Sequence, residues 1–331
     1  MRAKSGLSFF LVLLLLASCA REYSRTEFLL GTTCTIRTWG GGEKALSAAF
    51  ERIREIELRM STHLPDSEIN RLSTAGTRVS HDTCAVIRKA LEFGDLTDGL
   101  FDITIAPVVD LWGFGTDTRK VPSDDALKAA LDLVDYRRVQ IQPDCTVSID
   151  PGQKIDLGGI AKGYAADEAA RIMLDLGVER AIINLGGNVL VVGSKKDGSP
   201  WKIGIQDPFQ PTGSTVGVLE VGGGAVVTSG IYERVFEQGG SRYHHILDPG
   251  TGYPVENNLA GVSVAVPGGF DADVLSTAVF LLGIDKGCEL LNSFQNSGAV
   301  FITRDRNIIT YGTASEDFRK TNGSYEIIQR R

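Results

Sequence analysis

The chain has 331 residues, of which 43% are hydrophobic and 23% charged, and its formal net charge is −7. This length suffices for one large domain or two small ones. Binding to nucleic acid needs concentrated Lys and Arg, so the acidic balance argues against a nucleic-acid partner. A bound anion would need a metal ion or backbone donors to offset the negative charge.

The chain begins with the features of a secretory signal. Arg2 and Lys4 precede an apolar stretch over residues 7–16, which is too short to span a bilayer comfortably. The following residues, LASC, resemble the lipobox of bacterial lipoproteins, so we expect lipidation at Cys19. Loss of the signal, with its two basic residues, takes the net charge from −7 to −9.

This start divides the chain into three predicted segments. Residues 1–18 are a lipoprotein signal peptide, residues 19–26 a lipidated tether and residues 27–331 one domain. Acyl chains would hold that domain at a membrane surface. We therefore predict an exported, membrane-anchored lipoprotein, at the periplasmic face of the inner membrane if the cell is Gram-negative.

The other four cysteines lie far apart, with no CxxC pair and no histidine spacing typical of zinc sites. We favour buried thiols, and disulfides in an exported chain remain the alternative. These residues are Cys34, Cys84, Cys145 and Cys288.

Apolar periodicity predicts a mixture of strands and helices. In chain order, we expect a strand over 28–38, helices over 43–60, 82–95, 123–133 and 160–176, strands over 181–184, 189–192, 201–206, 216–221, 225–228 and 262–266, helices over 273–282 and 286–294, and strands over 300–303 and 308–311. The two types do not alternate regularly, so the pattern favours an α+β fold of mixed sheets with flanking helices.

Residues 156–167, DLGGIAKGYAAD, place glycines where a helix opens, an arrangement that presents backbone N–H groups to phosphates. The stretch matches neither a P-loop nor the GxGxxG spacing. A tight turn with close helix packing is an equally good interpretation. In residues 226–234, VVTSGIYER, the hydroxyls of Thr228 and Ser229 are expected to bond to backbone.

Residues 244–254, HHILDPGTGYP, hold two adjacent histidines followed by a turn. Neighbouring strand residues face opposite sides of a sheet. One of His244 and His245 could therefore meet a site while the other meets solvent. A surface histidine pair is the alternative, and a metal pair is disfavoured because the two rings diverge.

Asp273 and Thr277 are four residues apart in the stretch DADVLSTAVF, so a helix starting here places both side chains on one face. A carboxylate and a hydroxyl suit Mg²⁺, which usually shares its coordination with phosphates. The alternative is a helix N-cap at Asp271 or Asp273, with Ser276 or Thr277 in the first turn.

Eight stretches stand out in chain order: LGTTC (30–34), MSTHLPDSEINRL (60–72), GLFDITIAPVVDLWGFG (99–115), DLGGIAKGYAAD (156–167), INLGGN (183–188), VVTSGIYER (226–234), HHILDPGTGYP (244–254) and DADVLSTAVFLLG (271–283). Taken in this order they resemble the ApbE family of FAD:protein FMN transferases, and they cover most of the chain after the signal.

The resemblance implies an ApbE-like fold with an FAD cleft between two α/β parts. It also implies a Mg²⁺-dependent reaction that cleaves FAD, joins FMN by a phosphoester to a Thr of an exported redox protein, and releases AMP. Asp273, Thr277 and the backbone carbonyl of Gly159 would ligate Mg²⁺, which makes Asp273 catalytic. His245 would lie near the transferred phosphate, and with an ordinary pKa of about 6.5 it would accept the hydroxyl proton. The residues expected to contact the flavin nucleotide are Leu30, His63, Leu100, Phe101, Asp102, Asp156, Lys162 and Leu247.

The chain departs from the family pattern at His63, where members commonly place Tyr against the flavin ring. Some treponemal members act largely as FAD pyrophosphatases, which yield FMN and AMP, so His63 bears on the balance between transfer and hydrolysis. An Mg²⁺-dependent FAD pyrophosphatase is thus one alternative. A non-catalytic flavin-binding lipoprotein is another, although storage needs no catalytic metal.

Overall fold

The computed structural model describes residues 21–328, and these residues adopt an α+β fold, as predicted. The predicted signal peptide and Cys19 lie outside the described residues. In the described part of the chain, no helix is long and apolar enough to cross a membrane.

A nine-stranded sheet forms the centre of the fold, in the order β1-β2-β6-β7-β10-β13-β14-β15-β17. Its neighbours are antiparallel, apart from the parallel pair β15–β17. Its strands are β1 (Glu22–Leu29), β2 (Thr32–Trp39), β6 (Arg180–Leu185), β7 (Asn188–Val192), β10 (Gly224–Gly230), β13 (Leu259–Val266), β14 (Gly298–Thr303), β15 (Asn307–Gly312) and β17 (Glu326–Ile327).

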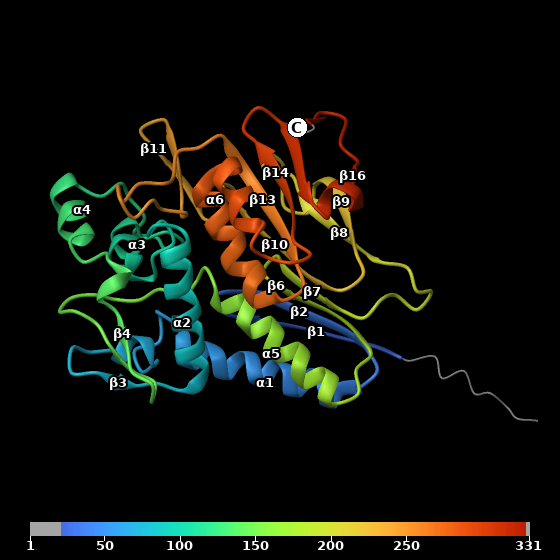
Figure 1. Cartoon of the computed structure of the whole chain (residues 1–331), viewed down its shortest axis with the longest axis horizontal. Helices are drawn as coiled ribbons and strands as arrows, with labels where there is room; N and C mark the ends of the chain where they lie inside the picture. Colours follow the sequence, from blue (N-terminus) through green and yellow to red (C-terminus); the bar gives the residue numbers. More distant parts are fainter. Residues whose placement is uncertain (1–20, 329–331) are drawn as a thin grey trace, which may run out of the picture.

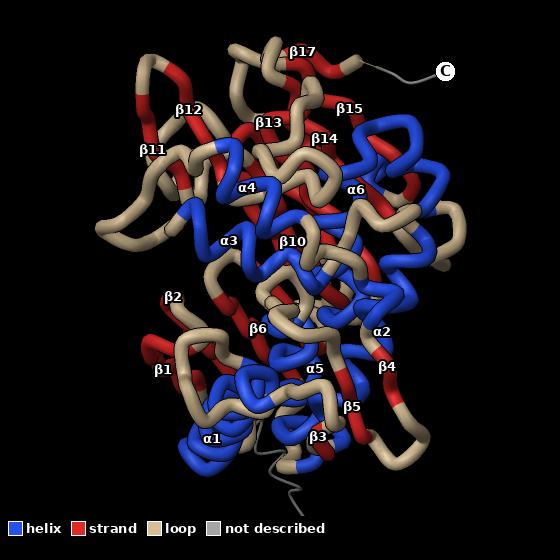
Figure 2. Tube along the Cα trace, turned by 90° about the vertical axis from the view of Figure 1, so that its left-hand side faces the viewer, coloured by secondary structure: helices blue, strands red, loops and turns tan. Residues whose placement is uncertain are grey.

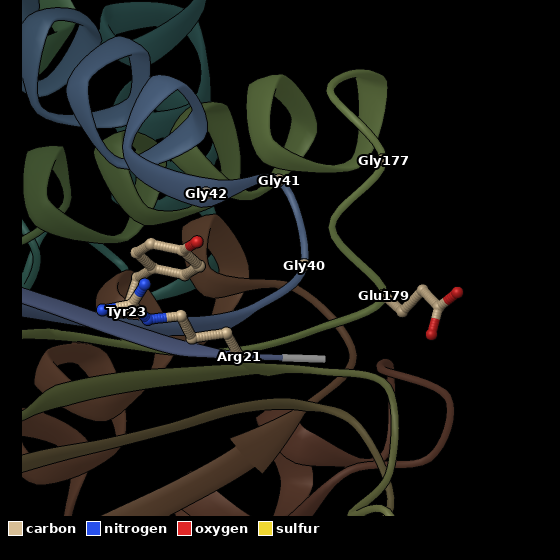
Figure 3. A pocket seen from close by; sticks show the side chains of 7 residues that line it. All are labelled: Arg21, Tyr23, Gly40, Gly41, Gly42, Gly177 and Glu179. Atoms are coloured by element: carbon tan, nitrogen blue, oxygen red, sulfur yellow. The ribbon is translucent and has the colours of Figure 1, made fainter. Parts of the chain in front are cut away.

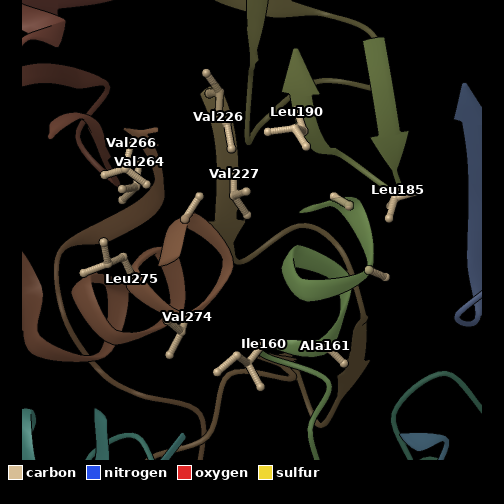
Figure 4. Close-up of a cluster of buried hydrophobic side chains, with 14 of the residues drawn as sticks. Ile160, Ala161, Leu185, Leu190, Val226, Val227, Val264, Val266, Val274 and Leu275 are labelled. Carbon is tan, nitrogen blue, oxygen red and sulfur yellow. The ribbon is translucent and has the colours of Figure 1, made fainter. Parts of the chain in front are cut away.

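Three helices pack on one face of this sheet: α1 (Gly42–Met60), α5 (Ala161–Asp175) and α6 (Gly269–Leu291) (Figure 1). Helix α1 buries apolar residues at helical spacing, including Phe50 and Ile53, as predicted. Figure 4 shows where α5 and α6 meet the buried valines and leucines of β7, β10 and β13. The start of α5 and the first turns of α6 therefore lie next to each other against the sheet.

A second, smaller core gathers around Trp112, whose Nε1 donates a 2.7 Å hydrogen bond to the carbonyl oxygen of Gly252. In the view of Figure 2, its helices lie between the β1–β2 hairpin and the β11–β12 hairpin. Its elements are α3 (Ala106–Trp112), α4 (Asp124–Leu131), β11 (Val235–Gln238) and β12 (Ser241–His244).

Shorter elements complete the fold. Trp39 of β2 packs against Trp201 of β8, with ring centroids 5.5 Å apart, and this contact joins a small sheet to the main one. The remaining elements are α2 (His81–Leu96), α7 (Ala314–Asp317), the 3-10 turns Ile69–Arg71, Ile103–Ile105 and Tyr136–Arg138, the sheet of β3 (Thr77–Arg78), β5 (Thr146–Ser148) and β4 (Gln140–Ile141), and the sheet of β16 (Phe318–Lys320), β9 (Thr215–Val221) and β8 (Trp201–Gln206).

The strand predicted over 28–38 is in fact two strands joined by a tight turn. Leu30 and Gly31 form the turn, with φ of 54° and 67°. The predicted tether over 19–26 is also wrong from Glu22 onward, because β1 begins there. β1 is an edge strand, and its solvent-facing residues are polar. Its composition therefore resembles that of a polar tether.

Helix α6 begins at Gly269, one turn earlier than predicted. Its N-cap residue is Gly268, so the alternative that Asp271 or Asp273 caps the helix is wrong. A left-handed residue, Gly283 with φ of 76°, separates the two helices predicted over 273–282 and 286–294. Asp273 consequently lies in the second turn of a buried helix.

Two of the cysteines form a disulfide, which corrects our preference for buried thiols. Cys84 of α2 and Cys145, just before β5, are joined with their Cα atoms 5.6 Å apart. Cys34 and Cys288 are buried and outside any disulfide. A separation of 61 residues gives no local sign of this pairing, which depends on how α2 packs against the small β3–β5–β4 sheet.

Candidate active site

The close approach of α5 to α6 brings the predicted metal ligands together. A Cβ on Gly163 would lie 2.1 Å from the carbonyl oxygen of Gly269 and 2.6 Å from Cβ of Asp273, so only glycine fits there. The Gly163 N–H donates a 2.8 Å hydrogen bond to Oδ2 of Asp273. The glycine-rich stretch at the start of α5 thus serves close helix packing, and it also orients a buried carboxylate.

The other oxygen of Asp273 faces a cation. Lys162 Nζ lies 3.5 Å from Asp273 Oδ1 and donates a 2.9 Å hydrogen bond to the carbonyl oxygen of Gly158. Asp273 is only 3% exposed. Because burying an unpaired carboxylate is costly, Lys162 stabilises the charged form of Asp273.

Thr277 lies one turn further along α6, on the same face as Asp273. Its hydroxyl is 3.5 Å from the backbone oxygen of Asp273 and 3.5 Å from the position that a Cβ on Gly159 would occupy. The three predicted ligand residues therefore meet in one place. In residues 21–328 there is no group of three or more His, Cys, Asp and Glu side chains that could hold a metal, so a cation here would depend on hydroxyl, carbonyl and ligand oxygens.

A cluster of hydroxyls beside Thr277 was not anticipated from the sequence. Ser229 Oγ, at the end of β10, lies 2.9 Å from Ser276 Oγ and 3.4 Å from Thr277 Oγ1. The Thr228 hydroxyl lies 2.7 Å from that of Ser263. Both hydroxyls of the TSG segment thus bond to side chains, where we had expected backbone partners. The sequence held no signal for this, because β10 and α6 pair only in the fold.

The tip of the β1–β2 hairpin carries Leu30 in a left-handed conformation that is costly for a bulky residue. Glu57 of α1 holds it there, since its Oε1 accepts a 2.6 Å hydrogen bond from the Leu30 N–H. Strain held in place by a specific contact is common at binding sites.

The residues expected to contact the flavin nucleotide differ in how free they are to do so. The ring of Phe101 lies against Gly159, 3.3 Å from its would-be Cβ. Asp156 accepts a 2.7 Å hydrogen bond from the Gly158 N–H with one oxygen. Asp102 uses both oxygens, because Oδ1 accepts from the Thr104 N–H and hydroxyl and Oδ2 from the Tyr136 N–H. Asp102 therefore orders this loop.

The other expected flavin contacts lie on separate elements. His63 is exposed on the loop after α1, and Leu100 is partly buried in the loop before α3. The amide of Asn70 holds the His63 loop by donating 2.9 Å hydrogen bonds to the carbonyls of Thr62 and Leu64. Leu247 is buried in the core around Trp112.

The two histidines differ in burial. His244 is buried, with its ring 6.0 Å from that of Phe280, whereas His245 is half-buried with its Nδ1 enclosed, so the alternative of a surface histidine pair is wrong. Burial lowers the pKa of His244 to about 4 and the pKa of His245 to about 3, with Arg234 and Lys162 further lowering the latter. The expected pKa near 6.5 for His245 is therefore wrong. His245 is neutral at pH 7, and its Nδ1 has no hydrogen-bond partner in the described residues.

Glu233 and Arg234 also belong to this neighbourhood and were not singled out in the sequence. Glu233 is exposed, and desolvation by the surrounding protein raises the pKa of its carboxyl, which interacts with Lys162, Arg234 and Asp273. Both residues follow β10 in the VVTSGIYER stretch. The available signal was a Glu-Arg pair a few residues after the predicted strand over 225–228.

A surface pocket of about 380 Å³ lies elsewhere, at the opposite end of α5 (Figure 3). Lys162 is in the first turn of α5 and Gly177 follows its last, so the pocket is roughly 22 Å from the site, at 1.5 Å per helical residue. None of the predicted site residues lines it. Its lining residues are Arg21, Tyr23, Gly40, Gly41, Gly42, Gly177 and Glu179.

The structure defines an α+β protein with a mainly antiparallel sheet covered by three helices. Its candidate site is the carboxylate–hydroxyl pair at the α5–α6 contact. Residues 30–302 match the ApbE family, and the chain belongs to that family.

Relatives and solved structures agree with this assignment over nearly the whole chain. The FAD:protein FMN transferase of Klebsiella pneumoniae (strain 342) is 35% identical over 314 residues, covering 93% of this chain and 98% of the relative. That of Treponema pallidum (strain Nichols) is 35% identical over 312 residues, covering 87% and 86%. The crystal structure of the ApbE protein from Thermotoga maritima aligns with a TM-score of 0.78 at 32% identity, covering 91% and 97%. The flavin transferase ApbE from Vibrio cholerae aligns with a TM-score of 0.77 at 29% identity, covering 92% and 98%.

The buried state of His244 predicts acid-sensitive stability. Its pKa is near 6.5 when unfolded and about 4 when folded, so the unfolded state binds more protons below pH 6.5. As the pH drops from about 6.5 to 4, the protonation of His244 in the unfolded state should lower the free energy of unfolding by about 2–3 kcal/mol. Urea unfolding of wild type and His244→Phe over this range measures the effect, and His81→Gln, at an exposed histidine, is the control. Identical pH slopes in wild type and His244→Phe would refute the prediction.

Proposed function

We propose that the chain transfers the FMN part of FAD to a Thr hydroxyl of an exported redox protein, in an Mg²⁺-dependent reaction that releases AMP. The coarse activity follows from the family: the chain is an FAD:protein FMN transferase, like its relatives from Klebsiella pneumoniae and Treponema pallidum. One observation carries the finer proposal, namely the meeting of Asp273, Thr277 and Gly159 at the α5–α6 contact.

The residues at this contact fit a magnesium ion. Asp273 keeps Oδ1 outside its backbone hydrogen bond, and the missing Cβ of Gly159 leaves room beside the Thr277 hydroxyl. Mg²⁺ accepts such oxygens and takes the rest from phosphates and water. When bound, it would neutralise charge on the diphosphate of FAD.

The side chains can then be assigned to parts of the transfer. The acceptor hydroxyl oxygen forms a new bond to the phosphorus on the flavin side of FAD, and the P–O bond to the AMP phosphate breaks. AMP leaves with the electron pair of that bond, and the hydroxyl proton passes to a ring nitrogen of neutral His245. A ligand diphosphate next to Lys162 and Arg234 would offset their positive charges. This would raise the pKa of His245 and make the ring a better proton acceptor.

The metal assignment predicts a sharp effect of charge removal at Asp273. Asp273→Asn keeps an oxygen for the Gly163 N–H but loses the carboxylate, so we expect a stable fold and at least a roughly 100-fold loss of Mg²⁺-dependent FAD turnover. The assay incubates FAD and Mg²⁺ with and without a candidate acceptor, and it is read by intact mass and nucleotide chromatography. Asp271→Asn, two residues earlier and paired with Lys89 at 2.9 Å, is the matched control.

Three results of this assay decide between the functions. An acceptor that gains FMN supports transfer. Release of FMN and AMP while no acceptor gains mass would support the FAD pyrophosphatase. Binding of FAD without turnover would support a flavin-binding lipoprotein. Wild-type turnover by Asp273→Asn would exclude Asp273 as a metal ligand.

The proposed base predicts a selective defect in His245→Gln. Because a glutamine cannot take the hydroxyl proton, transfer should slow about 10²–10⁴-fold while affinity for FAD changes little. Stopped assays give the rate, and flavin fluorescence titration gives the affinity. Equal losses in rate and affinity would demote His245 to a structural residue.

We also propose that the protein is exported and lipidated at Cys19, with residues 1–18 removed. The Cys84–Cys145 disulfide supports this, because disulfides persist in oxidising compartments outside the cytoplasm. Cells labelled with palmitate should yield a labelled, membrane-associated protein with Cys84 and Cys145 oxidised. A Cys19→Ser variant should lose label and membrane association. Palmitate label that persists in this variant would contradict lipidation at Cys19.

A further inference from the structure

Arg234 lies near the site, and within the described residues it has neither a hydrogen-bond partner nor an ion-pair partner. It lies in the loop between β10 and β11, and its side chain is exposed. Lys162, by contrast, lies near Asp273 and bonds to the Gly158 carbonyl. Of the two cations, Arg234 is therefore the one whose N–H donors remain available for a ligand.

The guanidinium of Arg234 points toward the strained hairpin tip. A Cβ on Gly31 would lie 3.7 Å from Arg234 Nη2, and a Cβ on Gly115 would lie 4.0 Å from Arg234 Cδ. Gly31 follows Leu30 in the β1–β2 turn, and Gly115 lies in the loop after α3. The side chain therefore extends between two loops, both of which lack a Cβ at the point of approach.

The charges around Arg234 converge on His245. Arg234 and Lys162 both act on the His245 ring, and both act on Glu233. Two cations from different elements thus act on one neutral histidine, and of the two only Lys162 is paired, with Asp273, in a chain with a net charge of −7. A local positive potential in an acidic protein concentrates an anionic ligand at that place.

We propose that Arg234 binds the diphosphate of FAD across the site from Asp273 and Lys162, and acts as a catalytic residue in its cleavage. This inference rests on the FAD-dependent function proposed above. A guanidinium offers paired N–H donors that match two phosphate oxygens. As the P–O bond to AMP breaks, negative charge grows on the departing phosphate, and Arg234 stabilises that charge. The proton of the acceptor hydroxyl goes to His245, so Arg234 keeps its own.

The test compares ligands with and without phosphate. Arg234→Gln should weaken FAD binding and lower kcat/KM for FAD about 10–100-fold, while riboflavin, which lacks phosphate, binds as it does to wild type. Fluorescence titration gives both affinities, and the affinity for FAD should also depend less on salt in the variant. Arg78→Gln, at another exposed arginine, is the matched control and should behave as wild type.

A second variant separates charge from geometry. Arg234→Lys should recover most of the FAD affinity through its charge but remain slow, because a lysine cannot donate two fixed parallel hydrogen bonds. Equal losses of riboflavin and FAD affinity in Arg234→Gln would show that Arg234 merely orders the hairpin tip, and so overturn the proposal. Unchanged FAD binding and turnover would overturn it as well.

The binding measurements also keep this inference separate from the proposed function. If wild type binds FAD but no acceptor gains FMN, the transfer proposal fails, and the FAD and riboflavin affinities still test Arg234. If transfer proceeds normally in Arg234→Gln, only the assignment of Arg234 fails.

Discussion

The site depends on one contact, the approach of α5 to α6 at Gly163. The Gly163 N–H bonds to Asp273 Oδ2 at 2.8 Å, and any Cβ at Gly163 would meet the Gly269 carbonyl at 2.1 Å. This contact positions a buried carboxylate without using both of its oxygens. It also sets Lys162, in the same first turn of α5, next to that carboxylate.

A second constraint is electrostatic. The chain is acidic overall, yet Lys162 and Arg234 face His245, and burial together with these charges holds that histidine neutral. The same groups that would hold a diphosphate also set how basic the histidine is, so ligand binding and proton transfer are coupled through the charges of these two side chains.

Local pattern was enough to predict elements whose core-facing residues recur at a regular spacing. Helix α1 and strands β6 and β7 match the predicted ranges closely for this reason. The errors have local causes too. The polar open face of edge strand β1 led to its prediction as a tether. The Pro-Gly-Gly stretch over 267–269 concealed the first turn of α6. The Cys84–Cys145 pairing needed a tertiary contact between distant segments.

By itself, the sequence determined the fold class, the family and the pairing of Asp273 with Thr277, because helical spacing alone places residues four apart on one face. Only the tertiary structure decided that Asp273 is buried against Gly163, that Ser229 joins Thr277, and that His244 is buried. It also brought Arg234 to the hairpin tip. Each of these depends on segments far apart in the chain, and desolvation and close packing act only once those segments have met.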